Sequence, residues 1–421
     1  MKAKTQSPRS KVAEAADRIM ERIAALARIS DEPGQLTRTY GSPAMRRAND
    51  LVAGWMRDAG MTVREDAIGN LLGRYEGTRA DAKAFLLGSH LDTVRNAGAF
   101  DGPLGVLLAI ECVKQLHATG ACLPFALEAA GFCDEEGVRF QSTYLGSRAL
   151  AGTLTEADLQ RMDENGVSLA DAIRNFGGQP ENLLSAKCDP RRLLGYAEVH
   201  IEQGPVLEQK HLAVGVVTAI AGQSRIRLRF TGQAGHAGTT PMHLRRDALC
   251  AAAEFIFAVE AHAHSVVGLV ATVGQIQVTP GASNVIPGEA HLTLDVRHQS
   301  NSVRLEACQH WQGAAESIGR QRGIFVSWEV VQQTASVPCD PELTALLKRA
   351  AQQHQSEVIE LPSGAGHDAA VMGRITPAVM LFVPCKDGLS HHPDESAKVE
   401  DIAVALDVMH DFLQLLAQKH G

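Results

Sequence analysis

Gly88-Ser89-His90-Leu91-Asp92-Thr93-Val94, with Phe100-Asp101-Gly102-Pro103 shortly after it, is the segment around which the chain is organised. The apolar run 84–87 directly before it predicts a buried strand that ends in a Gly-Ser pair. In open α/β sheets, ligands bind beyond the carboxyl ends of such strands. The segment therefore predicts an α/β sheet with a binding site at this edge.

The polar residues of this segment have the chemistry of metal ligands. His90 and Asp101 offer a neutral nitrogen and an anionic oxygen, a mixture that suits zinc or manganese. Asp92 lies two residues beyond His90 and would accept the other ring N–H, which fixes the tautomer. Taken alone, the segment is explained better by a surface histidine and two turn aspartates than by a metal site. The metal interpretation therefore depends on residues further along the chain.

Length, charge and cysteine usage narrow the class of protein. With 421 residues, 45% of them hydrophobic and 21% charged, the chain predicts a globular protein of two domains. A net charge of −8 argues against nucleic acid as the main partner, and no apolar stretch approaches membrane-spanning length. Residues 1–11 are polar and basic, which predicts a frayed tail rather than a secretory signal. Eight scattered cysteines without a C-x-x-C pair indicate reduced thiols and a cytoplasmic location.

Two later segments add acidic and imidazole groups at predicted strand ends. The apolar strand 123–130 leads into Asp134-Glu135-Glu136, which is either a solvated acidic loop or a set of carboxylates gathered around a positive charge. The flanking glycines and apolar residues favour an embedded loop. Strand 195–206 contains His200, and alternation places it on one face with Glu198 and Glu202.

The middle of the chain predicts a separate domain. Strict alternation over 224–231 is typical of a half-buried antiparallel strand, and the elements that follow have the order β-α-β-β-α-β of a ferredoxin-like fold. We therefore expect an inserted domain at 217–331. The parts 1–216 and 332–421 would form one discontinuous α/β/α domain.

Three histidines and three carboxylates at strand ends can hold two divalent ions if one carboxylate bridges them. One carboxylate must then stay free to take a proton from water. The candidates are His90, Asp101, Glu135, Glu136, His200 and His391.

The order of these motifs resembles the M20 family of dinuclear metallohydrolases, over about residues 29–416. Within it, the chain is similar to the hydantoinase/carbamoylase amidases, which include N-carbamoyl-L-amino-acid hydrolases and allantoate amidohydrolases. His200 stands where peptidase branches often carry a carboxylate, and this favours the amidase branch. The resemblance implies a zinc-peptidase-like α/β/α catalytic domain with a ferredoxin-like lid and dimerisation domain.

The resemblance also implies roles for the candidates. Two zinc or manganese ions per subunit would be held by His90 and His200 on one side and by Glu136 and His391 on the other. Asp101 would bridge the two ions, Asp92 would orient His90, and Glu135 would be the general base. His391 is preferred to His392 because it follows Ser390; His392 stands where relatives often have Asn.

Further residues match substrate-binding positions of the family. His236 would stabilise the oxyanion, in its own or the partner subunit's site, while Asn284 and Arg297 would bind a substrate carboxylate. An exposed strand arginine is an equally good interpretation of Arg297. Gln203 and Gly366 would line the pocket, and 367–368 would support the ligands.

These residues imply hydrolysis of the carbamoyl C–N bond of a small ureido-acid, with release of ammonia and carbon dioxide, by a homodimer. Allantoate and N-carbamoyl amino acids are not separated by motif. A dinuclear aminopeptidase or dipeptidase is the alternative. A non-catalytic ligand-binding relative is a third possibility that no residue favours.

Overall fold

The computed structural model describes residues 8–79 and 81–420, which divide into two compact units. Unit 1 contains the described residues up to Thr218 and those from Cys339 onward, and unit 2 spans Ala219–Pro338. Each unit has its own apolar core. Residues 1–7 of the expected frayed tail lie outside the described residues. The expectation is wrong for residues 8–11, because the first helix begins at Pro8.

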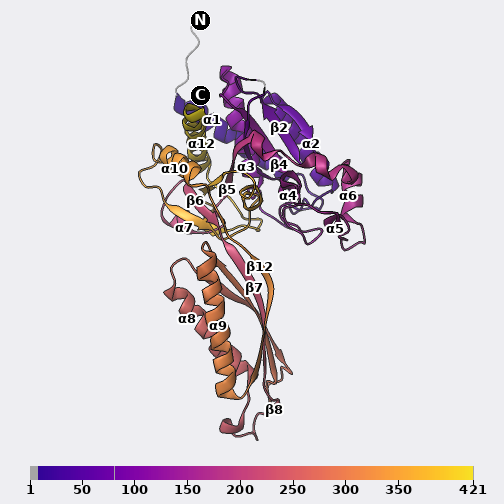
Figure 1. Cartoon of the computed structure of the whole chain (residues 1–421), viewed down its shortest axis with the longest axis vertical. Coiled ribbons are helices and arrows are strands. Elements are labelled where there is room, and N and C mark those ends of the chain that lie inside the picture. Colours follow the sequence, from indigo (N-terminus) through magenta and orange to yellow (C-terminus); the bar gives the residue numbers. More distant parts are fainter. Residues whose placement is uncertain (1–7, 80, 421) are drawn as a thin grey trace. The chain divides into compact units, whose positions relative to one another are not determined.

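Unit 1 is built on a mixed sheet with parallel strands at its centre, as the expected α/β fold requires (Figure 1). The strand order is β1-β2-β4-β3-β5-β15-β6-β13, with β14 paired to β6; β6 and β13 are the strands where the chain passes between the two units. β3 pairs in parallel with β4 and β5, and β5 pairs in parallel with β15. The strand bounds are β1 Thr62–Glu65, β2 Leu71–Tyr75, β3 Ala84–His90, β4 Ala126–Phe132, β5 Leu193–Ile201, β6 Gly215–Ile220, β13 Val337–Pro338, β14 Glu360–Ser363 and β15 Ala378–Val383.

The central strands are buried along their whole length, which requires cover on both faces of the sheet. Helix α3 packs across β3, β4 and β5, and α1 packs against α3 and α12. A short helix, α11, packs on β5 and β15. The helix bounds are α1 Pro8–Ala27, α2 Pro43–Asp58, α3 Pro103–Thr119, α4 Leu145–Ala151, α5 Glu156–Leu159, α6 Leu169–Phe176, α7 Val206–Gln209, α10 Pro341–Ala351, α11 Ala369–Met372 and α12 Val399–His420.

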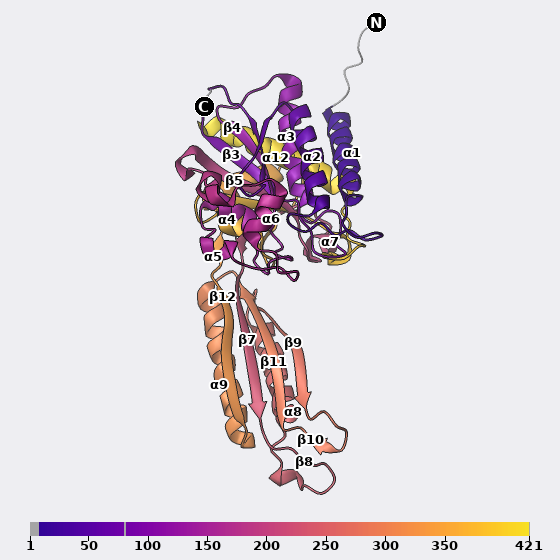
Figure 2. The same ribbon diagram turned by 90° about the vertical axis from the view of Figure 1, so that its right-hand side faces the viewer.

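Unit 2 has two long helices on a four-stranded antiparallel sheet in the order β12-β7-β11-β9 (Figure 2). In chain order these elements are β-α-β-β-α-β, the expected ferredoxin-like pattern. A small pair, β8 and β10, lies at one end of the long strands. The bounds are β7 Gly222–Thr231, β8 Gly235–His236, α8 Ala248–Ser265, β9 Val270–Thr279, β10 Val285–Ile286, β11 Glu289–His298, α9 Asn301–Arg322 and β12 Phe325–Thr334.

Candidate metal centre

The two histidines expected to share a cation stand at the carboxyl edge of neighbouring parallel strands. His90 is the last residue of β3, and His200 is the next-to-last residue of β5. Both side chains are buried. Asp101 reaches them from the loop before α3, where Gly102 has a φ of 83°. A Cβ at Gly102 would lie 2.5 Å from the His90 ring, so this close approach requires glycine.

Asp101 faces two separate groups of donors with its two carboxylate oxygens. Its Oδ1 lies 3.5 Å from His90 Nε2 and 3.1 Å from His200 Nε2. Its Oδ2 lies 3.2 Å from His391 Nε2, which in turn is 3.3 Å from Glu136 Oε1. Two sets of potential metal ligands therefore share Asp101: one with His90 and His200, the other with Glu136 and His391.

The electrostatics of these groups fit a cation. Asp101 is only 5% exposed. Burial alone would raise its pKa, but the three surrounding imidazoles hold the pKa of Asp101 well below its usual range. His200 Nε2 is buried and makes no hydrogen bond, while its Nδ1 donates to the carbonyl of Ile201 at 2.9 Å. A buried nitrogen of this kind, aimed at a carboxylate, is what a metal-binding imidazole requires.

Glu135 lies beside this cluster without sharing Asp101. One oxygen of its carboxylate lies within 4.8 Å of potential ligand atoms of His90 and Glu136, close enough for the three to hold an ion together. Burial raises the pKa of Glu135 well above its usual range; His90 opposes the rise and Glu136 adds to it. A buried carboxylate with a raised pKa has the properties of a general base near neutral pH.

Asp92 contacts His90 through its backbone carbonyl as well as through its carboxylate. The acceptor nearest to His90 Nδ1 is the backbone carbonyl of Asp92, at 3.1 Å, and the carboxylate is 3.4 Å away. The carboxylate also accepts the backbone N–H groups of Glu135 and Glu136, at 3.0 and 3.1 Å. Asp92 thus fixes both the ring of His90 and the acidic loop that carries the two glutamates.

Gln203 lies against the cluster. Its Nε2 donates to Asp101 Oδ2 and to Ser390 Oγ, both at 3.0 Å. Its Oε1 is buried without a hydrogen bond and remains an acceptor for a bound molecule. The strand face expected to carry Glu198, His200 and Glu202 does not include Glu202, because β5 ends at Ile201. The Glu202 carboxylate instead accepts the backbone N–H groups of residues 206 and 207.

Gly366 lies in the turn after β14, where the absence of a side chain leaves room for Tyr144. A Cβ at Gly366 would lie 1.8 Å from the Tyr144 hydroxyl oxygen. The backbone N–H of Tyr144 donates to the carbonyl of Glu135 at 2.9 Å. The turn and the loop of Glu135 are therefore neighbours.

The three site residues expected in unit 2 are divided between its two ends. His236 in β8 pairs with Val285 in β10, and Asn284 lies directly before that strand. Arg297 lies near the opposite end of β11, eight residues beyond Glu289, which at about 3.3 Å per residue is about 26 Å. One small carboxylate cannot contact both Asn284 and Arg297 of one chain. The expectation that both residues bind a substrate carboxylate therefore requires that they come from different subunits.

His236 has the tautomer that an oxyanion donor needs. The backbone N–H of Gly238 donates to His236 Nδ1 at 3.1 Å, so a neutral ring carries its proton on Nε2. Arg297 donates to both carboxylate oxygens of Asp295, at 2.8 and 3.2 Å, and its side chain is 32% exposed.

Sequence reasoning missed the buried partners that hold this centre together. Glu198 accepts hydrogen bonds from Ser89 Oγ at 2.7 Å, from Tyr196 Oη at 3.1 Å and from the N–H of Ala369 at 2.9 Å. These bonds occupy its carboxylate, so its proximity to His200 does not make it a free ligand. Alternation along β5 placed Glu198 beside His200, but nothing local indicated its partners.

His367 and His392 lie close to the ligands with other contacts. His367 Nε2 is 2.7 Å from Ser363 Oγ, and its ring packs edge-on against His200. Burial lowers the pKa of His367 well below its usual range, so the ring is neutral. His392 is exposed and interacts with Asp394.

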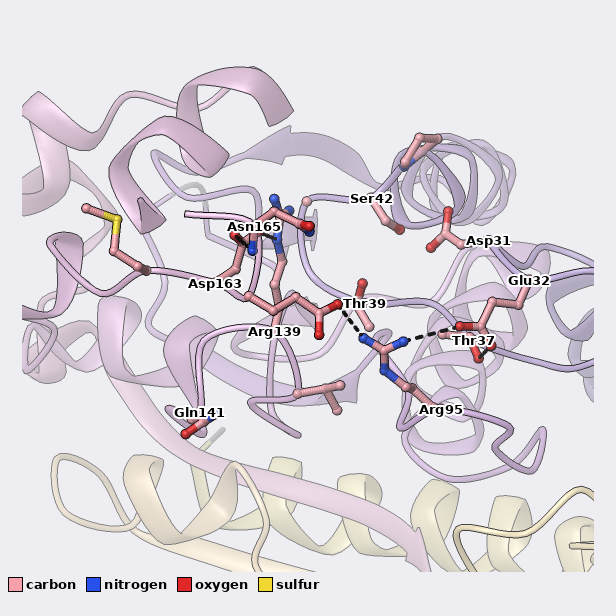
Figure 3. Close-up of a pocket in the computed structure, with 15 residues that line it drawn as sticks. Asp31, Glu32, Thr37, Thr39, Ser42, Arg95, Arg139, Gln141, Asp163 and Asn165 are labelled. Atoms are coloured by element: carbon pink, nitrogen blue, oxygen red, sulfur yellow. Dashed lines mark hydrogen bonds and ion pairs between the residues drawn. The ribbon is translucent and has the colours of Figure 1, made fainter. Parts of the chain in front are cut away.

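A separate cavity of about 540 Å³ in unit 1 is lined by none of the predicted site residues (Figure 3). Arg95 points across it and donates to Glu32 and Glu164, and Arg139 donates to Asp163. Five of its six charged side chains thus pair with one another, and the sixth, Asp31, accepts the backbone N–H of Ala44, so we assign the cavity no part in the site. The lining residues are Asp31, Glu32, Thr37, Thr39, Gly41, Ser42, Pro43, Arg95, Val138, Arg139, Gln141, Met162, Asp163, Glu164 and Asn165.

An α/β domain with imidazole and carboxylate donors gathered beyond the carboxyl ends of its strands, interrupted by a βαββαβ insertion, has the organisation of a protein that could bind divalent cations. The chain belongs to peptidase family M20/M25/M40, whose model matches residues 86–415. The resemblance expected from the motifs is thereby confirmed.

Individual relatives cover almost the whole chain. An N-carbamoyl-L-amino acid amidohydrolase of Geobacillus stearothermophilus is 42% identical over 403 residues, 96% of this chain and 98% of the relative. A probable allantoate deiminase of Oryza sativa subsp. japonica is 41% identical over 422 residues, which cover 92% of this chain and 86% of the relative. The crystal structure of a hydantoinase/carbamoylase family amidase from Burkholderia multivorans matches with a TM-score of 0.90 and 33% identity, over 96% of this chain and 98% of that one.

Proposed function

We propose that the protein hydrolyses the carbamoyl C–N bond of a small ureido-acid, an N-carbamoyl-L-amino acid or allantoate. Water would add to the carbamoyl carbon, the bond to the substituted nitrogen would break, and the carbamic acid formed would decompose to ammonia and carbon dioxide. The observation that carries this proposal is the position of Asp101 between two donor groups, with Glu135 beside them. Relatives named for ureido substrates at about 40% identity support the substrate class.

Two divalent cations, zinc or manganese, are proposed for this site. His90 and His200 would hold one, Glu136 and His391 the other, and Asp101 would contact both. The arrangement favours two ions, because two sets of potential ligands, one with His90 and His200 and one with Glu136 and His391, share Asp101. When bound, such ions polarise a carbonyl group and lower the pKa of water.

Glu135 is the proposed proton carrier. Its carboxylate would take a proton from the attacking water and deliver it to the departing nitrogen. Asp92 keeps Glu135 in place by accepting its backbone N–H. Burial of Glu135 excludes bulk water from this transfer and raises its proton affinity toward the working pH.

The substrate contacts are proposed to come from two subunits. Arg297 would bind the carboxylate. His236 Nε2–H would donate to the developing oxyanion, and Asn284 would bond to the substrate beside it. The part of β11 between Glu289 and Arg297 spans about 26 Å, and the β8–β10 pair with His236 and Asn284 lies at its Glu289 end, so a small substrate meets all three residues only if another subunit supplies one end. This supports a homodimer through unit 2. Gln203 Oε1 and the turn at Gly366 would line the pocket.

We also propose that the protein works in the cytoplasm. The eight cysteines are all free thiols, as expected in a reducing compartment. Among the described residues, no helix has both the length and the apolar character needed to cross a bilayer.

A substrate panel tests the proposed function. Chelator-stripped protein reloaded with manganese is assayed with allantoate, N-carbamoyl-L-amino acids and unmodified dipeptides, and ammonia and free amino groups are measured. We expect ammonia release from one ureido class and none from dipeptides. Dipeptide cleavage at a comparable kcat/KM would favour an aminopeptidase or dipeptidase instead. Binding of ureido-acids without turnover would indicate a non-catalytic relative.

A further inference from the structure

Glu395 is a buried carboxylate that joins the two loops on either side of the metal centre. It is 4% exposed and lies just after the segment of His391. One of its oxygens, Oε1, accepts the backbone N–H groups of Phe100 and Asp101, at 2.8 and 3.1 Å. The other, Oε2, lies 3.1 Å from the Ser390 hydroxyl. A single side chain therefore contacts the backbone of Asp101 and the residue before His391.

The loop of Asp101 is shaped to receive this side chain. A Cβ at Gly98 would lie 2.3 Å from both Cβ and Cδ of Glu395, closer than real Cβ atoms approach. The backbone of Gly98 is not in the left-handed region, so its conformation alone does not require a glycine at this position. The fit of Glu395 is therefore a specific packing requirement of the loop.

His391 needs such support more than the other imidazoles do. His90 and His200 are buried in strands, whereas the His391 side chain is 50% exposed and lies in a loop. Its φ of 56° is left-handed, a conformation that non-glycine residues adopt at a cost. The Ser390 hydroxyl also lies 2.8 Å from Asp101 Oδ2, so the two loops meet at Ser390.

We propose that Glu395 is a positioning residue that clamps the loop of Asp101 to the loop of His391 and thereby sets the affinity of the cation held by Glu136 and His391. This inference rests on the proposed two-cation site. The cation of His90 and His200 depends on it less, because strands fix both of those ligands.

The clamp acts through hydrogen bonds, so a glutamine can replace the glutamate. In Glu395→Gln, the amide oxygen would still accept the two N–H groups. The amide nitrogen would donate to Ser390 Oγ, which stays free to donate to Asp101. Glu395→Ala removes all three contacts. Gly98→Ala leaves the carboxylate present but displaces it.

Metal binding to chelator-stripped protein tests the proposal, with manganese titrated in a calorimeter and the bound metal counted by elemental analysis. Asp340→Ala is a matched control, since Asp340 also accepts two backbone N–H groups, at the start of α10, away from the ligands. We expect wild type, Glu395→Gln and Asp340→Ala to bind two ions. We expect Glu395→Ala and Gly98→Ala to bind one ion with near-normal affinity and the second at least tenfold more weakly.

The possible failures are distinguishable. Two ions bound by Glu395→Ala with affinities within twofold of wild type would overturn the clamp and leave the proposed function intact. Equal loss of the second ion in Asp340→Ala would show a general stability effect, which also overturns it. Wild-type protein that binds a single ion would overturn the two-cation site itself.

Discussion

Asn284 and Arg297 lie at opposite ends of unit 2, Asn284 directly before β10 and Arg297 near the far end of β11. Between Glu289 and Arg297, β11 spans about 26 Å and is paired on both sides, to β7 and to β9. The distance between the two ends is therefore a property of the paired sheet and not of a loop.

Subunit mixing tests whether two chains complete one site. Asn284→Ala and Arg297→Ala are each expected to lose most activity. If each site takes residues from both subunits, an equal mixture of the two variants gives a population in which half of the dimers are mixed. In each mixed dimer, one of the two sites has both Asn284 and Arg297 intact. Exchange of subunits between the two variants should therefore restore about a quarter of wild-type activity. Activity that stays at the sum of the two single variants would exclude shared sites.

Glu135→Gln separates proton transfer from binding. The amide keeps the size of the side chain but cannot take a proton, so kcat should fall by about 10²–10⁴-fold. KM and the bound-metal count should change little, because all five proposed metal ligands are kept in this variant. Steady-state kinetics with elemental analysis measures all three. A variant that keeps more than a tenth of wild-type kcat would remove Glu135 from its proposed role.

The sequence predicted those parts of the structure that depend on local pattern. The apolar run of β3 and the motif residues at His90, Asp101, Glu135 and His200 come together as expected. Strand ends were less predictable. The strand expected at 195–206 ends at Ile201, because the Glu202 carboxylate accepts the backbone N–H groups of residues 206 and 207, where α7 begins.

Long-range hydrogen bonds could not be predicted from one sequence. Glu395 and Phe100 are 295 positions apart, and Glu198 and Ala369 are 171 apart. Neither Glu395, which lies in a loop, nor Glu198, which lies in a strand, has a local sequence feature that identifies these hydrogen-bond partners. Their roles depend on which backbone N–H groups the tertiary fold leaves for them.

Asp401 provides a pH-dependent test of stability away from the site. Burial raises its pKa to about 6, with Lys398 opposing and Glu400 adding to the rise. An acid whose folded-state pKa is raised destabilises the protein when ionised, so this cost is present above pH 6 and disappears as the pH falls toward 4. Asp401→Asn should therefore be more stable than wild type by about 1 kcal/mol at pH 8, after allowance for solvent screening and the favourable helix dipole.

Unfolding in urea at pH 8, 6 and 4 measures this difference. The two proteins should converge at pH 4, where wild-type Asp401 is protonated in the folded state. Glu400→Gln, which changes the neighbouring exposed acid, serves as the control and should show a much smaller pH dependence. A stabilisation by Asp401→Asn that is equal at all three pH values would contradict the raised pKa.

Glu198 allows a test of whether a buried carboxylate acts through its charge or through its hydrogen bonds. It is fully buried and accepts bonds from Ser89, Tyr196 and the N–H of Ala369. In Glu198→Gln, the amide oxygen can keep the last two partners, and the Ser89 hydroxyl can turn to accept from the amide nitrogen. This variant should lose less than about 1 kcal/mol of unfolding free energy.

Glu198→Leu fills a similar volume but leaves donors without acceptors beneath β3. Tyr196 Oη can still donate to the carbonyl of Gly88, at 2.9 Å, so Ser89 Oγ and the N–H of Ala369 are the groups left unpaired. At about 1–3 kcal/mol for each unsatisfied group, the loss should be about 2–6 kcal/mol in urea unfolding of the chelator-stripped protein. Equal losses for the two variants would mean that the charge of Glu198 matters more than its bonds. The carboxylate would then have to be counted with the acids that the proposed cations balance.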